Sequence, residues 1–206
     1  NTALEAKIVR RESERRETAE IEAENERVRE LYGLATRYSG YSFDTASILT
    51  WTASNYSSSF TINKGTANST VEVGDSVITE SGVLIGVVTA VEEHQSTAIS
   101  IVDTKFSAGC IIESSGDSAV ASGDYTLMRR ELLKLAFVNS GTKYLSGDTI
   151  VTSGRGGVYP KGLVIGTIDA IETSADGASS FAAIKPSARL SELTDVYLIT
   201  DFDTAE

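Results

Sequence analysis

The sequence has few of the residues that build metal sites, disulfides or rigid loops. It contains one cysteine, one histidine and two prolines among 206 residues. A single cysteine excludes an internal disulfide framework and a cysteine-rich zinc site, and a lone histidine leaves a metal centre short of its usual ligands. Cys110 lies in an apolar context and is predicted to be a small buried side chain. We therefore expect neither a metal nor a cofactor.

Basic residues and long apolar runs are also scarce. Lys and Arg number 18 against 29 Asp and Glu, which gives a net charge of −11 and a pI near 4.6. This balance disfavours nucleic acid as a partner and provides no polybasic patch for anionic lipid. No run is long and apolar enough for a membrane span. Because the chain begins at Asn1 and not at Met, directly in helix-forming sequence, we expect it to be a fragment of a longer protein.

The first 32 residues lack proline and glycine and are rich in Glu, Arg and Ala, which predicts a long helix. Ile21 and Val28 are seven residues apart and Leu31 follows three later, which is the a, a, d spacing of a coiled-coil seam. We expect the helix to end at Gly33 or Gly40. Two interpretations remain open, a parallel coiled coil that forms a stalk and a solvated single helix.

Beyond residue 43 the sequence changes to short β-prone segments separated by turns, and one unit occurs twice. Residues 73–79 (VGDSVIT) match 146–152 (SGDTIVT), and 82–92 (GVLIGVVTAVE) match 162–172 (GLVIGTIDAIE). Two copies of a β unit indicate two similar subdomains. The predicted fold is mainly β, with an N-terminal long α-helix followed by two small β-barrels. The predicted boundaries are 1–36 for the coiled-coil helix, 43–125 for the first barrel, 126–201 for the second barrel, with edge strands that can interleave, and 202–206 for the tail.

The second copy contains an insertion, roughly residues 155–161, in a glycine-rich stretch that reads TSGRGGVYPKGLVIG over 152–166. Because the first copy lacks it, this loop is the better candidate for a special role. Val158, Tyr159 and Pro160 are predicted to form an exposed partner contact, since an unpaired aromatic in a structured loop suits an interface. The alternative is that Tyr159 caps a barrel core.

Three arrangements with possible chemistry are weighed and set aside. His94, Asp103 and Ser153 could form the triad of a two-barrel serine hydrolase, but His94 lies in a polar turn and is better explained as an exposed turn residue. The glycines of 154–157 could cradle a phosphate, but a proline and a strand follow them in place of a helix. Glu92 and Glu172 occupy equivalent positions and are expected to be solvated strand-end residues. The sequence therefore predicts that the protein is not an enzyme.

The glycine-rich stretch resembles the signature of the rod shape-determining protein family MreC. Its family-motif positions here are Thr152, Ser153, Gly154, Gly156, Gly157, Tyr159, Pro160, Gly162 and Gly166. Further segments resemble the same family in the same order, namely 24–31, 63–65, 71–75, 82–88 and 103–109. The resemblance covers nearly the whole chain from about residue 20. It departs where Val164 replaces the family's usual proline.

The resemblance implies a non-enzymatic scaffold of the bacterial cell-elongation machinery, which organises peptidoglycan synthesis and cell shape through protein contacts. It implies anchoring by one N-terminal membrane helix, with this region on the extracytoplasmic side of the cytoplasmic membrane. The implied partners are a second copy of the chain, as a dimer or filament, a class B penicillin-binding transpeptidase, MreD, RodZ and, indirectly, MreB. A surface or secreted serine hydrolase is the alternative.

Overall fold

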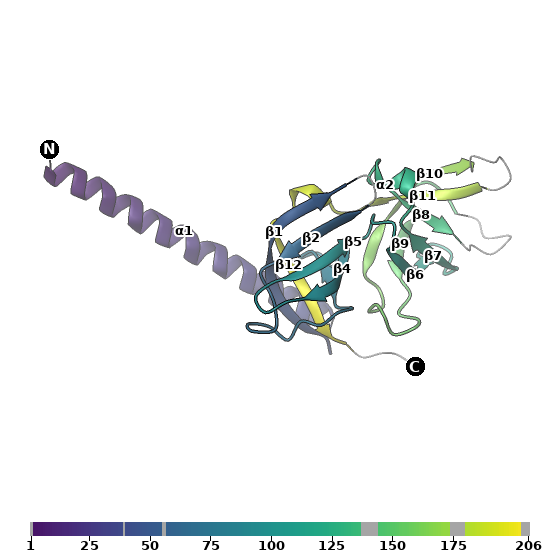
Figure 1. Ribbon diagram of the computed structural model, residues 1–206, viewed down its shortest axis with the longest axis horizontal. Helices are drawn as coiled ribbons and strands as arrows, with labels where there is room; N and C mark the ends of the chain where they lie inside the picture. The colour runs from purple at the N-terminus through teal and green to yellow at the C-terminus, as the bar shows by residue number, and fades with distance from the viewer. Residues whose placement is uncertain (1, 39, 55–56, 137–143, 174–179, 203–206) are drawn as a thin grey trace. The chain divides into compact units, whose positions relative to one another are not determined.

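The computed structural model describes residues 2–38, 40–54, 57–136, 144–173 and 180–202 (Figure 1). The chain divides into two compact units, a helical unit Asn1–Ser39 and a β unit Gly40–Glu206. The predicted tail, 202–206, lies outside the described residues except for Phe202.

The helical unit consists of α1, Thr2–Arg37. Gly33 lies inside this helix and does not end it, because its backbone keeps a helical conformation, whereas Gly40 has a φ of +97°. Ile21 and Val28 are each 56% exposed, and Leu31 is half-buried. The coiled-coil pairing of these three residues stays a prediction. No described helix is both long and apolar enough to cross a membrane.

The β unit consists of two closed barrels of antiparallel strands (Figure 1). The first barrel contains, in spatial order, β1 (Ser42–Ala53), β12 (Asp195–Asp201), β3 (Ser76–Ile78), β4 (Leu84–Val91), β5 (Ser96–Ser100) and β2 (Ser58–Ile62). The second barrel contains β10 (Val164–Thr173), β11 (Ser180–Pro186), β8 (Leu133–Ala136), β7 (Ser118–Ser122), β6 (Ser107–Ile112) and β9 (Thr149–Thr152). A short helix α2 (Tyr125–Met128) precedes β8, and a 3-10 turn η1 (Leu190–Glu192) precedes β12.

The predicted barrel boundaries, 43–125 and 126–201, are wrong for β6 and β7, whereas the return of β12 is an interleaving of an edge strand that the prediction allowed. Strands β6 and β7 belong to the second barrel, and β12 returns to the first barrel, where it pairs with β1 and β3. Figure 1 shows β12, in yellow at the end of the chain, beside the blue β1. The second barrel is therefore inserted between β5 and β12. The repeat could not reveal this, because it covers β3–β4 and β9–β10 alone, and the remaining strands carry no copied sequence.

The two copies of the repeat have the same irregularity in the same place. The register of β4 against β5 shifts between Val88 and Ala90, and the register of β10 against β11 shifts between Ile168 and Ala170. These are equivalent positions in the alignment of the copies. A bulge bends and twists a strand locally, so each copy curves its barrel at the same point.

The turn before each repeat strand is built by the same hydrogen bonds. Gly74 N–H donates to the Val88 carbonyl at 2.9 Å, and Gly147 N–H donates to the Ile168 carbonyl at 2.8 Å. Both glycines have positive φ, +105° and +96°, which glycine adopts without a steric penalty. The sequence repeat is therefore a structural duplication, as predicted.

Each barrel encloses an apolar core of large aliphatic and aromatic side chains. Fully buried members of the first barrel are Phe60, Ile62, Ile78, Leu84, Ile85 and Tyr197, and those of the second are Ile112, Leu133, Ile150, Ile165 and Ile184. Cys110 on β6 is also fully buried, and burial raises the pKa of its thiol to about 12. The prediction of a buried Cys110 is confirmed.

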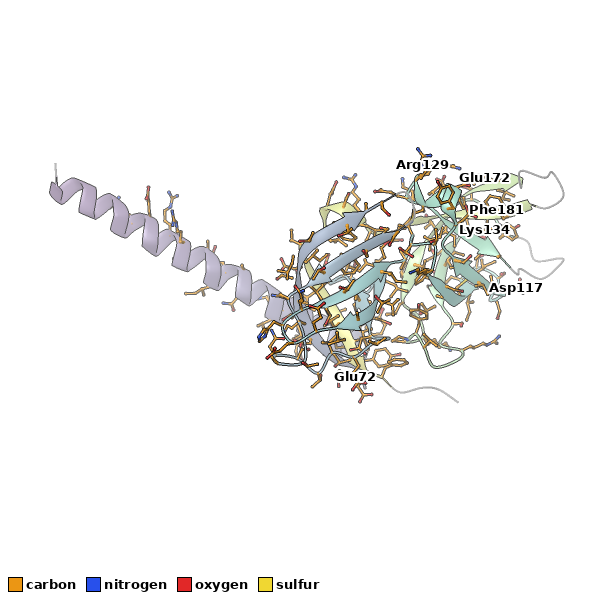
Figure 2. The ribbon with its side chains drawn as sticks, in the orientation of Figure 1. Glu72, Asp117, Arg129, Lys134, Glu172 and Phe181 are labelled. Atoms are coloured by element: carbon orange, nitrogen blue, oxygen red, sulfur yellow. The ribbon has the colours of Figure 1, made fainter. Side chains whose placement is uncertain are left out.

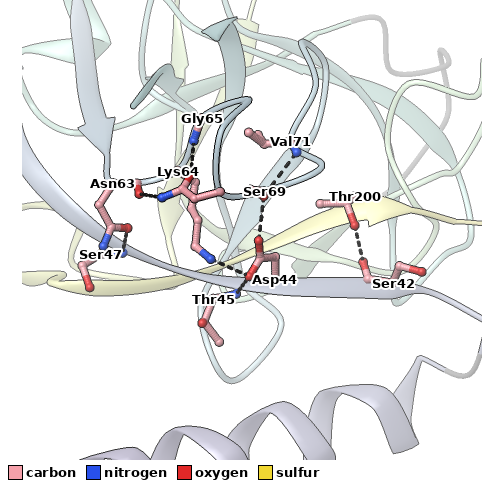
Figure 3. Close-up of polar contacts among 11 residues, drawn as sticks. Ser42, Asp44, Thr45, Ser47, Asn63, Lys64, Gly65, Ser69, Val71 and Thr200 are labelled. Carbon is pink, nitrogen blue, oxygen red and sulfur yellow. Dashed lines mark hydrogen bonds and ion pairs between the residues drawn. The ribbon is translucent and has the colours of Figure 1, made fainter. Parts of the chain in front are cut away.

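Asp44 on β1 is the centre of a polar cluster on the first barrel (Figure 3). Its carboxylate accepts hydrogen bonds from Ser69 Oγ at 2.6 Å, from Lys64 Nζ at 2.9 Å and from Thr45 N–H at 2.8 Å. Burial alone raises the pKa of this carboxyl, but the hydrogen bonds and the Lys64 charge outweigh burial, so the pKa lies below its ordinary 3.8. The cluster ties the segment between β2 and β3 to β1.

We expect Lys64→Met to lower the free energy of unfolding at pH 7 by about 1 kcal/mol. A carboxyl with a lowered folded pKa stabilises the fold above its unfolded pKa and loses this contribution as pH falls through the folded pKa. The difference between parent and variant should therefore shrink below about pH 4. Urea unfolding measured in steps from pH 7 to pH 3 checks this, and a difference that stays constant with pH would contradict it.

Candidate functional site

The glycine-rich loop joins β9 to β10 and is closed at its base by Thr152. Thr152 Oγ1 donates to the Pro160 carbonyl at 2.5 Å and accepts from Leu163 N–H at 2.9 Å. The Thr152 backbone pairs with Leu163 and Gly162 at 2.8 and 2.9 Å. Gly162 has a φ of +85°, which explains the glycine. One hydroxyl therefore holds together both ends of the loop.

The first copy of the repeat has the same base without the inserted loop. Thr79 Oγ1 accepts from Val83 N–H at 3.2 Å, and the backbones of these two residues pair at 2.9 Å. Gly82, the equivalent of Gly162, has a φ of +82°. The loop is thus an insertion into a turn that the first copy closes directly.

We expect Thr152→Val to lower the free energy of unfolding by about 2 kcal/mol. The variant keeps the shape of the side chain but leaves the buried Leu163 N–H without its acceptor, and an unpaired buried donor costs about 1–3 kcal/mol. Thermal unfolding of Thr152→Val beside Thr152→Ser, which keeps the hydroxyl, measures this. Equal stability of the two variants would show that the hydroxyl does not hold the loop.

Within the loop, Tyr159 points into the protein. It is 8% exposed and its ring lies 5.8 Å from that of Phe106, at 58°. Burial raises the pKa of Tyr159 to about 12. Pro160 is also buried, whereas Val158 is 55% exposed. The prediction that Tyr159 and Pro160 are exposed is wrong. Tyr159 is buried, as the alternative required, but the ring it contacts is that of Phe106, in the segment between β5 and β6.

Of the three residues predicted to form an exposed partner contact, Val158 is the one that lies on the surface. Its neighbours Arg155, Gly156 and Gly157 are exposed as well, and Arg155 Nη1 donates to Ser118 Oγ on β7 at 2.8 Å. The exposed part of the loop is therefore 155–158. A partner contact at Val158 stays a prediction.

The three residues of the hydrolase alternative have separate environments. The Asp103 carboxylate is buried and accepts from Ser57 Oγ at 2.9 Å and Ser58 N–H at 2.7 Å. The His94 side chain is 76% exposed in the turn after β4, 3.8 Å from Glu93. The partners of Asp103 are thus Ser57, Ser58 and Lys105, and His94 is exposed beside Glu93, an arrangement that gives no support to a triad.

The remaining candidates for chemistry have ordinary local partners. Ser153 Oγ accepts from Arg155 N–H at 3.2 Å, and Glu92 accepts from Gln95 at 2.8 Å. Glu172 on β10 forms a two-bond ion pair with Arg130, at 3.0 and 2.8 Å. The loop 154–157 leads into the strand β10 and not into a helix, so it lacks the helix N-terminus of a phosphate site. Within the described residues, no cluster of His, Cys, Asp or Glu could hold a metal.

Glu172 belongs to a small charged and aromatic group on the second barrel (Figure 2). Phe181 lies opposite Glu172 in the β10–β11 pairing. Lys134 Nζ on β8 lies 4.8 Å from the centre of the Phe181 ring, a cation–π contact. The group joins three neighbouring strands. Glu172 was predicted to be a solvated strand-end residue, but its side chain is only 27% exposed and is paired with Arg130.

Two residues that organise the site were missed as such from the sequence. From the sequence, Asp103 stands out only as a possible triad acid, and Phe106 is not singled out at all. Their segment, 103–109, carries a resemblance to the family, which was the available signal. The partners of both lie far away in the sequence, at Ser57 and Tyr159.

Comparisons with known proteins agree with one another. The family described as rod shape-determining protein MreC, barrel core, matches residues 48–200. The cell shape-determining protein MreC of Bacillus subtilis is 30% identical over 189 residues, which cover 87% of this chain and 64% of that protein. The chain thus spans less than two thirds of that relative.

Solved structures show the same fold. The structure of MreC from Listeria monocytogenes is 27% identical with a TM-score of 0.68, over 92% of this chain and 94% of that chain. MreC in a complex with the penicillin-binding protein PBP2 from Helicobacter pylori has a TM-score of 0.56 at 13% identity, over 78% and 99%, which shows the fold alone. The names of these relatives describe a protein that determines cell shape, and not an enzyme. The chain belongs to the MreC family of rod shape-determining proteins.

Proposed function

We propose that this chain is a non-enzymatic scaffold of the cell-elongation machinery, which acts by binding a class B penicillin-binding transpeptidase that makes peptidoglycan. The observation that carries the proposal is the family match over both barrels. The Helicobacter pylori relative solved in complex with PBP2 supports the choice of partner. Closed barrels suit such a role, because they present side chains and turns and leave no free strand edge.

The proposal includes the place of the chain in the cell. We propose that a preceding membrane helix anchors it in the cytoplasmic membrane and that α1 and the barrels lie on the extracytoplasmic side, where peptidoglycan is assembled. MreD and RodZ are proposed as further partners, with an indirect connection to MreB. These assignments rest on the family and on the partner's chemistry.

Self-association is proposed to occur through α1. Ile21 and Val28 are large apolar residues exposed on the same helix, and their heptad spacing allows a parallel coiled coil. We expect the double variant Ile21→Asp, Val28→Asp to lower the sedimentation mass of the chain towards that of a monomer. Arg11→Ala, Arg29→Ala is the matched control, since it changes two exposed helix residues outside the seam. An unchanged mass for the Asp variant would contradict the coiled coil.

A pull-down with the cognate transpeptidase tests the proposed function. We expect the whole chain to retain the transpeptidase, and the same chain without residues 1–32 to retain it as well, because the barrels form a separate compact unit. Val158→Asp tests the exposed tip of the loop. We expect it to weaken retention, with Glu80→Lys in the shorter turn of the first copy as the comparison. No retention by either form of the chain would contradict the proposal.

A further inference from the structure

The segment that connects the two barrels, residues 101–106, is built as part of the interior. It leaves the first barrel after β5 and enters the second at β6. Ile101, Val102, Asp103 and Phe106 are all buried. Connections between domains are usually exposed, polar and in contact with few other groups. The burial of this one indicates that its position is fixed.

Asp103 fastens the connection to the first barrel. One carboxylate oxygen accepts from Ser57 Oγ and Ser58 N–H, which lie at the start of β2, and the other accepts from Lys105 N–H at 2.9 Å. The residue is 0% exposed. A buried carboxylate is tolerated only when such hydrogen bonds replace water, and bonds to a charged group are the stronger kind.

The second barrel holds the same connection from the other side. Gly123 N–H, just after β7, donates to the Phe106 carbonyl at 3.0 Å. A Cβ on Gly123 would collide with the Asp103 carbonyl, so the two backbones lie in direct contact. Tyr159 of the glycine-rich loop packs its ring on Phe106.

The two repeat copies also touch each other directly. Val164 N–H donates to the Gly82 carbonyl at 3.3 Å, and Val83 and Val164 form an isolated parallel bridge. This backbone contact by itself would still allow the two barrels to rotate about it. The connection 101–106 supplies the further contacts that restrict such a rotation.

We propose that residues 101–106 form a latch that holds the two barrels in one relative orientation, with Asp103 as its positioning residue. Asp103 fixes the latch to β2, and Tyr159 fixes it to the glycine-rich loop through Phe106. This gives the buried part of the family motif a role inside the molecule. It goes beyond the proposed function and does not depend on any partner.

The test measures the distance between the barrels. Spin labels are attached to cysteines introduced by Glu93→Cys in the first barrel and Glu113→Cys in the second, both exposed positions. The native Cys110 is buried and stays unlabelled in the folded protein. Pulsed electron resonance then gives the distance distribution. Fluorescence of the single tryptophan, Trp51, whose ring lies 4.7 Å from that of Phe60, reports whether the first barrel is folded.

We expect a single narrow distribution of label-to-label distances in the parent. In Asp103→Asn this distribution should broaden until no single distance dominates, and in Ser57→Ala it should broaden less. Asp169→Asn, an exposed change on β10, should keep the narrow distance. If Asp103→Asn does not fold, Ser57→Ala decides alone, since Ser57 is only half-buried. A narrow, unshifted distance in the folded latch variants would overturn the proposal, whatever the result of transpeptidase binding.

Discussion

Gly166→Ala is expected to lower the free energy of unfolding by about 3 kcal/mol. Gly166 lies on β10 at the end of the family motif, and a Cβ there would collide with the Lys185 carbonyl and lie 2.9 Å from Ile184 Cγ2. Neither group can move freely, since both belong to the paired strand β11. Chemical denaturation of the two proteins measures the difference.

The repeat provides an internal check on this prediction. Gly86 is the equivalent glycine of β4, and its Cβ would collide with the Ile99 carbonyl and lie 2.9 Å from Phe60, so Gly86→Ala should cost a similar amount. Gly156→Ala is the matched control in the exposed loop, where nothing lies within 4 Å and only the positive φ is strained. It should cost about 1 kcal/mol. A Gly166→Ala protein as stable as Gly156→Ala would show that the strands separate more easily than the packing implies.

Tyr159→Ala is expected to have an effect of similar size, a loss of about 3 kcal/mol, because it removes a buried aromatic ring from the contact with Phe106. The neighbouring residue gives a sharp contrast. Val158 is exposed, so Val158→Ala should change stability by less than about 0.5 kcal/mol. Thermal unfolding of both variants and the parent checks this.

Tyr159→Phe separates the ring from its hydroxyl. It keeps the aromatic contact, so we expect it to stay within about 1 kcal/mol of the parent. If Tyr159→Ala were as stable as Tyr159→Phe, the ring would not contribute to the fold, and the exposed-contact interpretation would have to be reconsidered.

The duplicated unit could be predicted because its signals are local. Thr79 and Thr152 each end a β-branched strand, and Gly82 and Gly162 each mark a return turn, so the two copies align without knowledge of the rest. Burial of Cys110 followed from its apolar neighbours. Each of these features depends on residues a few positions apart in the chain, so the pattern can be recognised from the sequence alone.

The features that could not be predicted depend on distant residues. The sequence prediction allowed edge strands to interleave but did not identify β12, which closes the first barrel although the whole second barrel intervenes in the chain. From the sequence, Tyr159 has no evident partner, because Phe106 lies far earlier in the chain. Asp103 resembled a catalytic acid because its partners, Ser57 and Ser58, lie far earlier in the sequence, at the N-terminal end of β2. In each case a long-range contact determines the role of a residue whose own neighbourhood is uninformative.

The central claim is that the barrels act by binding another protein. A calorimetric titration of the chain without residues 1–32 against the purified cognate transpeptidase tests this most directly. The account predicts saturable binding by the barrel unit, weakened by Val158→Asp in a protein that unfolds at the parental temperature. Absence of binding by the folded barrel unit, at concentrations where the whole chain binds, would contradict it.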